Sequence, residues 1–233
     1  MSIRSIYLPS PSFENDRLRI TGDEHRHLTV ARAEPDELLE VFDGNGHVWT
    51  TAIQSIGKRE TITRVTVSRT APPPSLDLFL GMAIIRIAAF EQALEKAVEV
   101  GVTRIIPFTA ARSNVTPGNR HDRWVRILIE AAKQSKHYYI PKLDLPASFA
   151  EVLSIPASSK IIFAERNGGP PKAALVGSPV LYLIGPEGGW TDEELAQAAN
   201  NGFTSVSLGE AILKAETAAT VGGALIRYEL ERL

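Results

Sequence analysis

Leu183-Ile184-Gly185-Pro186-Glu187-Gly188-Gly189-Trp190 is the stretch of sequence that decides the fold. Its start belongs to the apolar run 180–184, which predicts a strand covered on both faces. Glycine and proline then end the strand within a few residues. Open α/β sheets bind ligands at the carboxyl ends of their strands, and glycines there let a ligand approach the main chain. The alternative is a tight strand-to-helix turn that binds nothing.

Strands and helices alternate on both sides of this stretch. Apolar runs predict further strands at residues 78–85, 104–108, 160–164 and 206–208. Helical patterns predict a helix around Phe90 that stops near Gly101, another around Trp124, one capped by Thr191 and Glu194, and a last one at 216–233. This alternation predicts an α/β domain with a mostly parallel sheet.

The N-terminal part has a different pattern. Residues 38–42 and 47–53 flank Asp43-Gly44-Asn45-Gly46 and predict a strand–turn–strand, and residues 61–67 alternate as a half-buried strand does. A small β-barrel with one short helix within residues 23–33 is expected. Pro72-Pro73-Pro74 predicts a linker, since three prolines remove three backbone donors. The expected domains are residues 1–71 and 75–233.

Composition excludes several classes of protein. The chain has 233 residues, no cysteine, and a formal net charge of -2. Disulfides, thiolate metal sites and cysteine nucleophiles are therefore excluded. His25 and His27 are expected to be surface histidines, and no metal site is predicted. The start of the chain does not resemble a signal peptide, and no apolar run is long enough to span a membrane. We therefore expect a cytoplasmic protein.

A basic segment, residues 101–142, contrasts with this overall charge. It contains 8 Lys or Arg and 2 acidic residues, a balance of 8 − 2 = +6, and aromatic residues are interleaved with them. We call it the basic island. Such a composition suits RNA, because cations neutralise phosphates and bases stack on rings. The alternative is a solvated helix face with Trp124 in the core.

A second motif, Leu208-Gly209-Glu210-Ala211-Ile212-Leu213-Lys214-Ala215-Glu216-Thr217-Ala218-Ala219, joins an expected strand to the last helix. Taken alone, Glu216 or Thr217 would cap that helix, and Lys214 would be a solvated charge. Gly-x-Gly-x-x-Gly and the phosphate-binding Gly-x-x-x-x-Gly-Lys-Ser/Thr are both absent from the sequence, which argues against a dinucleotide or nucleoside-triphosphate fold.

Together the two motifs resemble the RsmE family, bacterial 16S ribosomal RNA uracil-N3 methyltransferases of the SPOUT class. The resemblance extends over nearly the whole chain. His27-Leu28 and residues 38–46 resemble the PUA-like N-terminal barrel of that family. Further matches are Glu91, Lys96, Glu99, Gly101, Val102, Arg112-Ser113 and Gln134-Ser135.

The resemblance implies a C-terminal domain tied in a deep trefoil knot, a homodimer, and S-adenosylmethionine held in the knot. It also implies small-subunit 16S rRNA as the substrate, methylated at a uracil N3. By matched position the implied cofactor-binding residues are Leu183, Ile184, Gly185, Glu187, Gly188, Leu208, Gly209, Ile212, Leu213 and Thr217. Glu216 is the candidate proton acceptor or loop-orienting group, with Lys214 beside it. The expected RNA contacts are Arg26, Arg112, Arg123, Arg126 and Lys133.

This chain departs from the family pattern at several polar positions. They are Ala89, Lys133, His137, Glu210, Ala211, Lys214 and Ala215. Two alternatives therefore stay open: a SPOUT methyltransferase with another RNA target, and an RNA-binding homologue that has lost catalysis. The lack of cysteine removes the thiolate usually needed for carbon-5 methylation of a pyrimidine, whereas transfer to nitrogen or oxygen stays open.

Overall fold

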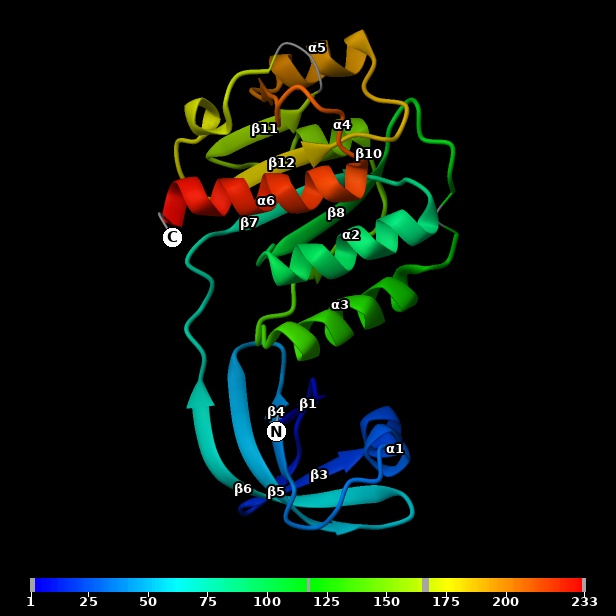
Figure 1. Ribbon diagram of the computed structural model, residues 1–233, viewed down its shortest axis with the longest axis vertical. Coiled ribbons are helices and arrows are strands. Elements are labelled where there is room, and N and C mark those ends of the chain that lie inside the picture. Colours follow the sequence, from blue (N-terminus) through cyan, green and yellow to red (C-terminus); the bar gives the residue numbers. More distant parts are fainter. Residues whose placement is uncertain (1–2, 117, 165–167, 232–233) are drawn as a thin grey trace. The chain divides into compact units, whose positions relative to one another are not determined.

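The computed structural model describes residues 3–116, 118–164 and 168–231, and the chain divides into two compact units (Figure 1). The first contains Met1–Pro73 and Ala132–Ile140, and the second Pro74–Ala131 and Pro141–Leu233. The sequence suggested two contiguous domains, whereas residues 132–140 belong with the first unit. Contacts explain this: Lys136 Nζ donates to Glu40 Oε1 at 2.9 Å, and the Tyr139 hydroxyl donates to the Ala71 carbonyl at 3.2 Å.

The first unit is a curved six-stranded sheet in the order β1-β4-β5-β6-β3-β2. Its strands are β1 (Arg4–Tyr7), β2 (Phe13–Glu14), β3 (Arg17–Thr21), β4 (Leu38–Phe42), β5 (His47–Ile56) and β6 (Glu60–Thr70). The expected strand–turn–strand is the antiparallel pair β4–β5, and α1 (Gly22–Val30) is the expected short helix. The buried core is formed by Ile6, Leu18, Ile20, Leu28, Leu39, Val41 and Ile53.

One polar expectation for this unit is wrong. His25 is buried, with its Nδ1 2.9 Å from Thr61 Oγ1, so it is not a surface histidine. It lies on the inner side of α1 beside Leu28, and the threonine hydroxyl satisfies its ring nitrogen there.

The second unit contains a parallel sheet in the order β10-β8-β7-β12-β11-β13, and β9 pairs with β8. The strands are β7 (Leu78–Ala83), β8 (Arg104–Thr109), β9 (Lys142–Leu143), β10 (Ala147–Ser148), β11 (Ser159–Phe163), β12 (Val180–Ile184) and β13 (Thr204–Val206). The parallel sheet expected from the alternation is confirmed. The last strand, however, ends at Val206, because the Ser207 hydroxyl turns to the backbone of Gly209 at 3.1 and 3.3 Å and starts a loop.

Helices cover both faces of this sheet (Figure 1). They are α2 (Ile87–Glu99), α3 (His121–Ser135), α4 (Phe149–Leu153), the 3-10 turn η1 (Pro171–Ala174), α5 (Asp192–Asn200) and α6 (Ala215–Glu231). Trp124 is buried in α3 with its ring 4.6 Å from that of Phe90, as its place on the apolar helical face predicts. Helix α4 was not predicted from the sequence, although Ser148 and Glu151 form a capping box at its start.

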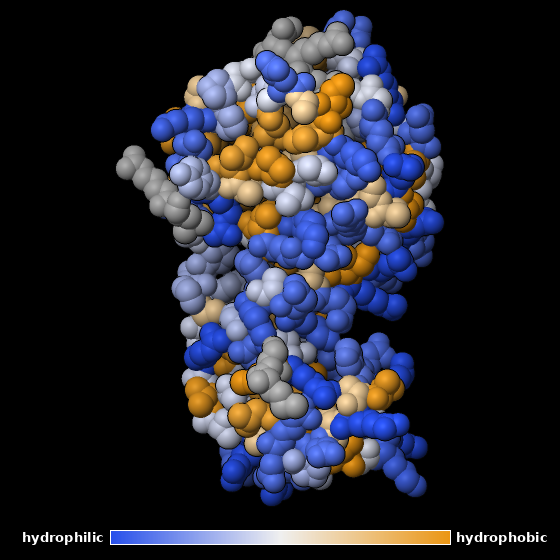
Figure 2. Space-filling model, viewed as in Figure 1, coloured by the Kyte–Doolittle hydropathy of each residue, from blue (hydrophilic) through white to orange (hydrophobic). Residues whose placement is uncertain are grey.

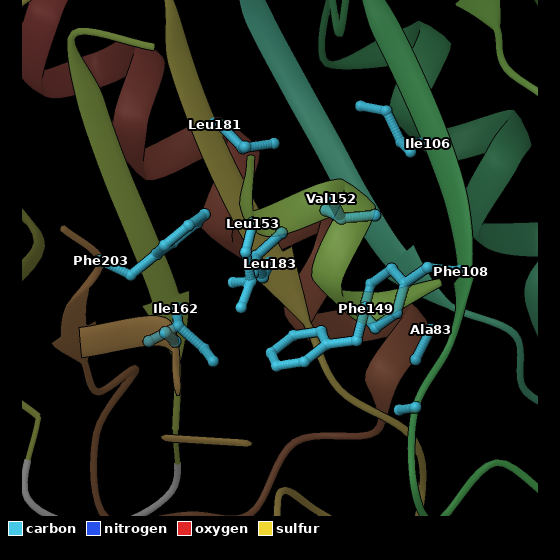
Figure 3. Close-up of a cluster of buried hydrophobic side chains, with 12 residues drawn as sticks. Ala83, Ile106, Phe108, Phe149, Val152, Leu153, Ile162, Leu181, Leu183 and Phe203 are labelled. Atoms are coloured by element: carbon cyan, nitrogen blue, oxygen red, sulfur yellow. The ribbon is translucent and has the colours of Figure 1, made fainter. Parts of the chain in front are cut away.

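A cluster of buried side chains fixes the carboxyl ends of the central strands (Figure 3). Phe149, Val152 and Leu153 of α4 pack on Leu181 and Leu183 of β12. Fully burying one such side chain stabilises the fold by about 1.5–3 kcal/mol. The loops that follow these strands are therefore attached to a rigid base.

Candidate active site

A cavity of about 950 Å³ lies in the second unit, where its strands end. Its wall comes from loops after five of the strands: β7, β8, β11, β12 and β13. The strand order changes direction between β7 and β12, which are neighbours although β8 follows β7 in the chain. Ligands of open α/β sheets bind at such a switch point, outside the carboxyl ends of the strands.

The loop 185–190 is held down by Trp190. Trp190 Nε1 donates to the Phe163 carbonyl at 2.8 Å, and its indole stacks on Phe108 with ring centres 6.1 Å apart. A Cβ at Gly185 would lie 2.8 Å from the Trp190 ring, so only glycine fits there. This contact keeps the loop against the end of the sheet.

Arg112 ties the same loop to the end of β8. Its Nη1 donates to the carbonyl oxygens of Gly188 at 2.8 Å and Trp190 at 3.2 Å. The preceding backbone N–H, of Ala111, donates to Glu194 Oε1 at 2.8 Å. Glu194 also forms the expected capping box with Thr191, so one buried carboxylate holds both α5 and the Arg112 loop.

Two other glycines leave main chain open to the cavity. Gly189 and Gly209 line the wall, have φ values of 69° and 113°, and have nothing within 4 Å of where a Cβ would stand. A positive φ favours glycine, and an open Cβ position lets a ligand come close to the backbone. Gly188 differs, because a Cβ there would meet the Cβ of Arg112 at 3.1 Å. Its small size makes room for Arg112 rather than for a ligand.

Charged side chains gather on one part of the wall. Arg86 Nε is 2.8 Å from Glu187 Oε1, and this carboxylate raises the pKa of the Arg86 guanidinium, with a smaller contribution from Glu216. Glu216 stands in the first turn of α6 and Lys214 just before it, and both line the cavity.

The position of α6, and so of Glu216, depends on two adjacent glycines. A Cβ at Gly222 would lie 2.6 Å from Phe163, and one at Gly223 would lie 2.8 Å from the Tyr182 hydroxyl. That hydroxyl donates to the Ala219 carbonyl at 3.1 Å. The helix therefore packs directly on β11 and β12.

Eight of the ten residues expected to bind a cofactor line this cavity, since only Leu183 and Thr217 of the ten are outside its wall. Leu183 is fully buried in β12 and belongs to the hydrophobic core. Thr217 is exposed in the first turn of α6. Both candidate catalytic residues, Glu216 and Lys214, lie in the wall.

The residues expected to contact RNA are divided between the two units, with Arg26 and Lys133 in the first and Arg112, Arg123 and Arg126 in the second. Arg112 lies in the cavity wall, and Arg123 donates two hydrogen bonds to Glu91 at 2.5 and 2.7 Å. The side chain of Lys133 is 8% exposed and pairs with Glu24 at 3.0 Å in the first unit.

The other two expected contacts are also exposed. Arg126 is exposed on α3. Arg26 of α1 is 75% exposed and 3.0 Å from Asp23.

Several residues of the wall were not among the expected cofactor-binding residues, chiefly Arg86, Phe163 and Trp190. Arg86 directly follows the apolar run 78–85, and Phe163 is the next-to-last residue of the expected strand 160–164. Since both lie at the carboxyl end of a strand, the rule that pointed to the loop after β12 also applies to them. No His, Cys, Asp or Glu cluster that could hold a metal ion occurs among the described residues. No helix in the described part of the chain is long and apolar enough to cross a membrane.

Comparison with known proteins agrees with this architecture. Residues 72–227 match the family model of an RNA methyltransferase domain, and residues 20–65 match that of an RNA methyltransferase PUA domain. Ribosomal RNA small subunit methyltransferase E from Synechocystis is 31% identical over 99% of this chain and 79% of its own length.

Two solved structures are similar over almost their whole length. Ribosomal RNA small subunit methyltransferase E from Neisseria gonorrhoeae, bound to S-adenosyl methionine, has a TM-score of 0.92 at 29% identity and covers 98% of both chains. A putative methyltransferase from Legionella pneumophila, in complex with the same cofactor, has a TM-score of 0.90 at 27% identity and covers 97% of this chain and 98% of its own.

Fold and cavity thus define a SPOUT-type RNA methyltransferase domain joined to a PUA domain. Within that class, the chain belongs to the family of ribosomal RNA small subunit methyltransferase E.

Proposed function

We propose that this protein transfers the methyl group of S-adenosylmethionine to N3 of a uracil in the RNA of the small ribosomal subunit. The observation that carries the proposal is the cavity at the strand ends, where open glycine backbone and the Glu216 carboxylate share one wall. An RNA of the ribosome as substrate implies work in the cytoplasm.

The wall suits this cofactor chemically. A volume of about 950 Å³ is within the range of about 300–1,000 Å³ usual for small-molecule sites. Gly189 and Gly209, with open space at their Cβ positions, would let an adenine or a ribose come close to the main chain of the wall. Ile212 and Leu213 supply apolar surface, while Arg86 and Lys214 can meet a carboxylate.

When bound, the cofactor supplies an electrophilic methyl on a sulfonium. The protein's own contribution is to position groups and to move one proton. Uracil N3 carries a hydrogen that must leave, and the Glu216 carboxylate is the proposed acceptor. The ring must also be aligned with the methyl, and orientation of this kind supplies a large share of many enzymatic rate enhancements. Arg86 and Glu187, paired at 2.8 Å on the same wall, would keep the loop in place during alignment.

The test is transfer of a labelled methyl group from S-adenosylmethionine to purified small-subunit rRNA and to assembled small subunits, followed by mapping of the modified nucleotide. A single 3-methyluridine supports the proposal. Methylation of another atom or of another RNA would instead favour a different target within the class. Cofactor binding without transfer to either substrate would indicate an RNA-binding homologue that has lost catalysis.

We also propose a homodimer formed through α6. Val221, Ala224, Leu225 and Tyr228 follow one another at helical spacing, and Leu225 is 37% and Tyr228 59% exposed. Figure 2 shows hydrophobic surface gathered around this helix. Burial of such a stripe against a second copy would remove it from water. Sedimentation of the wild type and of Tyr228→Glu tests this: we expect a dimer that the variant weakens, and a wild-type species of 25.4 kDa at micromolar concentration would contradict it. The trefoil knot stays a prediction from the family resemblance.

A further inference from the structure

Two arginines of the first unit stand directly opposite each other. Arg17 of β3 and Arg64 of β6 are cross-strand partners in an antiparallel pair. Partners of this kind point to the same face of a sheet with Cβ atoms about 4.5–5.5 Å apart, and like charges so placed destabilise the sheet. Both side chains are exposed. The pairing therefore has an electrostatic cost that the fold itself does not explain.

No carboxylate in the described part of the chain reaches either guanidinium to offset this repulsion. By contrast, two other arginines of the same unit have carboxylate partners: Arg4 pairs with Glu37 at 2.7 Å, and Arg69 with Glu40 at 3.3 Å.

Arg19 lies two residues along β3 and so on the same face as Arg17. It takes both nearby glutamates, Glu14 at 3.3 Å and Glu60 at 3.4 Å. Arg17 and Arg64 are thus left as a pair of positive charges on a sheet face.

Two more cations lie near the start of β6. Lys58 and Arg59 are exposed in the turn that joins β5 to β6, beyond Glu60. Asp16, in the turn between β2 and β3, is the nearest further acid along the chain, and it forms no ion pair with Arg17 or Arg64. We call Arg17, Arg19 and Arg64 the arginine row. These three residues become neighbours because β3 pairs with β6, a strand that is far from it in the sequence.

We propose that Arg17 and Arg64 form a phosphate-contact surface for the RNA substrate on the β3–β6 face of the PUA domain. This inference rests on the proposed function. Planar guanidinium groups bind phosphate oxygens in pairs, and a polyanion removes the repulsion between two cations that face the same way. The charge of the face thus complements the RNA backbone, whereas the cations of the basic island are largely engaged inside the protein.

The experiment measures affinity of the full-length protein for a small-subunit rRNA transcript as a function of salt. The variants are Arg17→Gln, Arg64→Gln and the double variant. Each lost contact should reduce the slope of log affinity against log salt by about 0.7–0.9 and weaken binding about four- to fivefold at ~0.15 M salt. The double variant should show the sum. Cofactor affinity should stay unchanged, because the cavity is built from other residues.

Three controls make the outcome specific. Lys172→Gln removes the same charge from the second unit, where that side chain is 81% exposed, and should leave the slope unchanged. Arg17→Lys keeps the charge and should keep the slope. The melting temperature of Arg64→Gln should equal or exceed that of the wild type, because a repulsion is removed. If the melting temperature fell and the RNA salt slope stayed unchanged, the arginine row would have a structural role, and the proposal would be overturned.

The failure of this inference is distinguishable from failure of the proposed function. If the wild type methylates the RNA and the double variant does so with unchanged KM and salt slope, only the arginine row is refuted. If the wild type neither binds nor methylates ribosomal RNA, both proposals fall. If the double variant loses binding to vesicles of anionic lipid or to a protein partner and not to RNA, the surface serves another ligand and this proposal is wrong.

Discussion

The cavity wall and the basic island, residues 101–142, differ in where the partners of their residues lie. In the cavity, two short stretches supply most of the wall, and Gly189 and Gly209 leave open backbone in it. In the island, Arg123 pairs with Glu91 of α2, and Lys133 with Glu24 of the first unit. A site formed by main-chain groups is built from residues that are close in the sequence. The partner of a long charged side chain, in contrast, depends on which residues the fold places near it.

The largest expected effect belongs to the cavity. Glu216→Gln removes the proposed proton acceptor but keeps its shape, so turnover should fall about 10²-fold or more. Cofactor affinity should change by less than about twofold, because the effect is confined to the transition state. Methyl transfer and calorimetry measure the two quantities. Glu193→Gln, an exposed acid of α5 outside the wall, is the matched control. Equal loss of rate and cofactor affinity would make Glu216 a structural cap.

Next in size is a change within the island that acts on stability. Lys133→Met leaves the Glu24 carboxylate, 14% exposed, without the ammonium that faces it at 3.0 Å. Breaking such a pair should lower the free energy of unfolding by about 2–4 kcal/mol, somewhat less than for a fully buried pair. Urea unfolding of the full chain measures this.

The companion variant Glu24→Gln/Lys133→Met should recover part of the loss, and Lys172→Met should cost nothing measurable, because Lys172 is 81% exposed. An unchanged stability with a reduced RNA salt slope would restore Lys133 as a phosphate contact.

The cavity and the basic island also differ in how far the sequence alone predicts them. Strand ends followed by glycine predicted the place of the cavity, because apolar runs and chain-breaking residues are local features. Local spacing also predicted the capping box of Thr191 and Glu194. The hydrogen bond from the Ala111 N–H to the Glu194 carboxylate was not predictable, since it joins residues 83 positions apart.

Surface charge was the least predictable feature. Arg17 and Arg64 are unremarkable in the sequence and become neighbours only through the register of β3 and β6. Likewise, nothing in the periodicity of residues 132–140 shows that they pack with the first unit. Long-range pairing decides both, and pattern reasoning carries no information on it.

A smaller effect is expected in the loop of the cavity. Gly185→Val would push a side chain into Trp190, 2.8 Å from the Cβ position, and the indole is fixed by Phe108 and by the Phe163 carbonyl. Overpacking of this kind costs about 1–3 kcal/mol, so cofactor affinity should fall about ten- to hundredfold. Gly169→Ala, where a Cβ meets nothing within 4 Å, should leave affinity unchanged. If a folded Gly185→Val protein bound the cofactor normally, this loop would not be part of the cofactor site.

The smallest effect is expected at Arg123, the island cation whose partner is most clearly defined. Arg123→Gln should reduce the RNA salt slope by less than about 0.3, against about 0.7–0.9 for a true phosphate contact, because Glu91 already neutralises the guanidinium. Its effect on the free energy of unfolding should stay below about 1 kcal/mol, since Arg123 is 66% exposed. The hydrogen bonds from Arg123 hold the pKa of the Glu91 carboxyl below its usual value.

A lowered pKa in the folded state stabilises the protein above the unfolded pKa of about 4.3 and ceases to do so as pH falls through the folded value. The stability difference between wild type and Arg123→Gln should therefore be constant from pH 7 to about pH 5 and shrink toward zero below about pH 4. Unfolding curves at several pH values, beside salt titrations with RNA, measure both quantities. If the RNA salt slope of Arg123→Gln fell by as much as for a true phosphate contact, Arg123 would exchange Glu91 for a phosphate on binding. The basic island and the arginine row would then both contact the RNA.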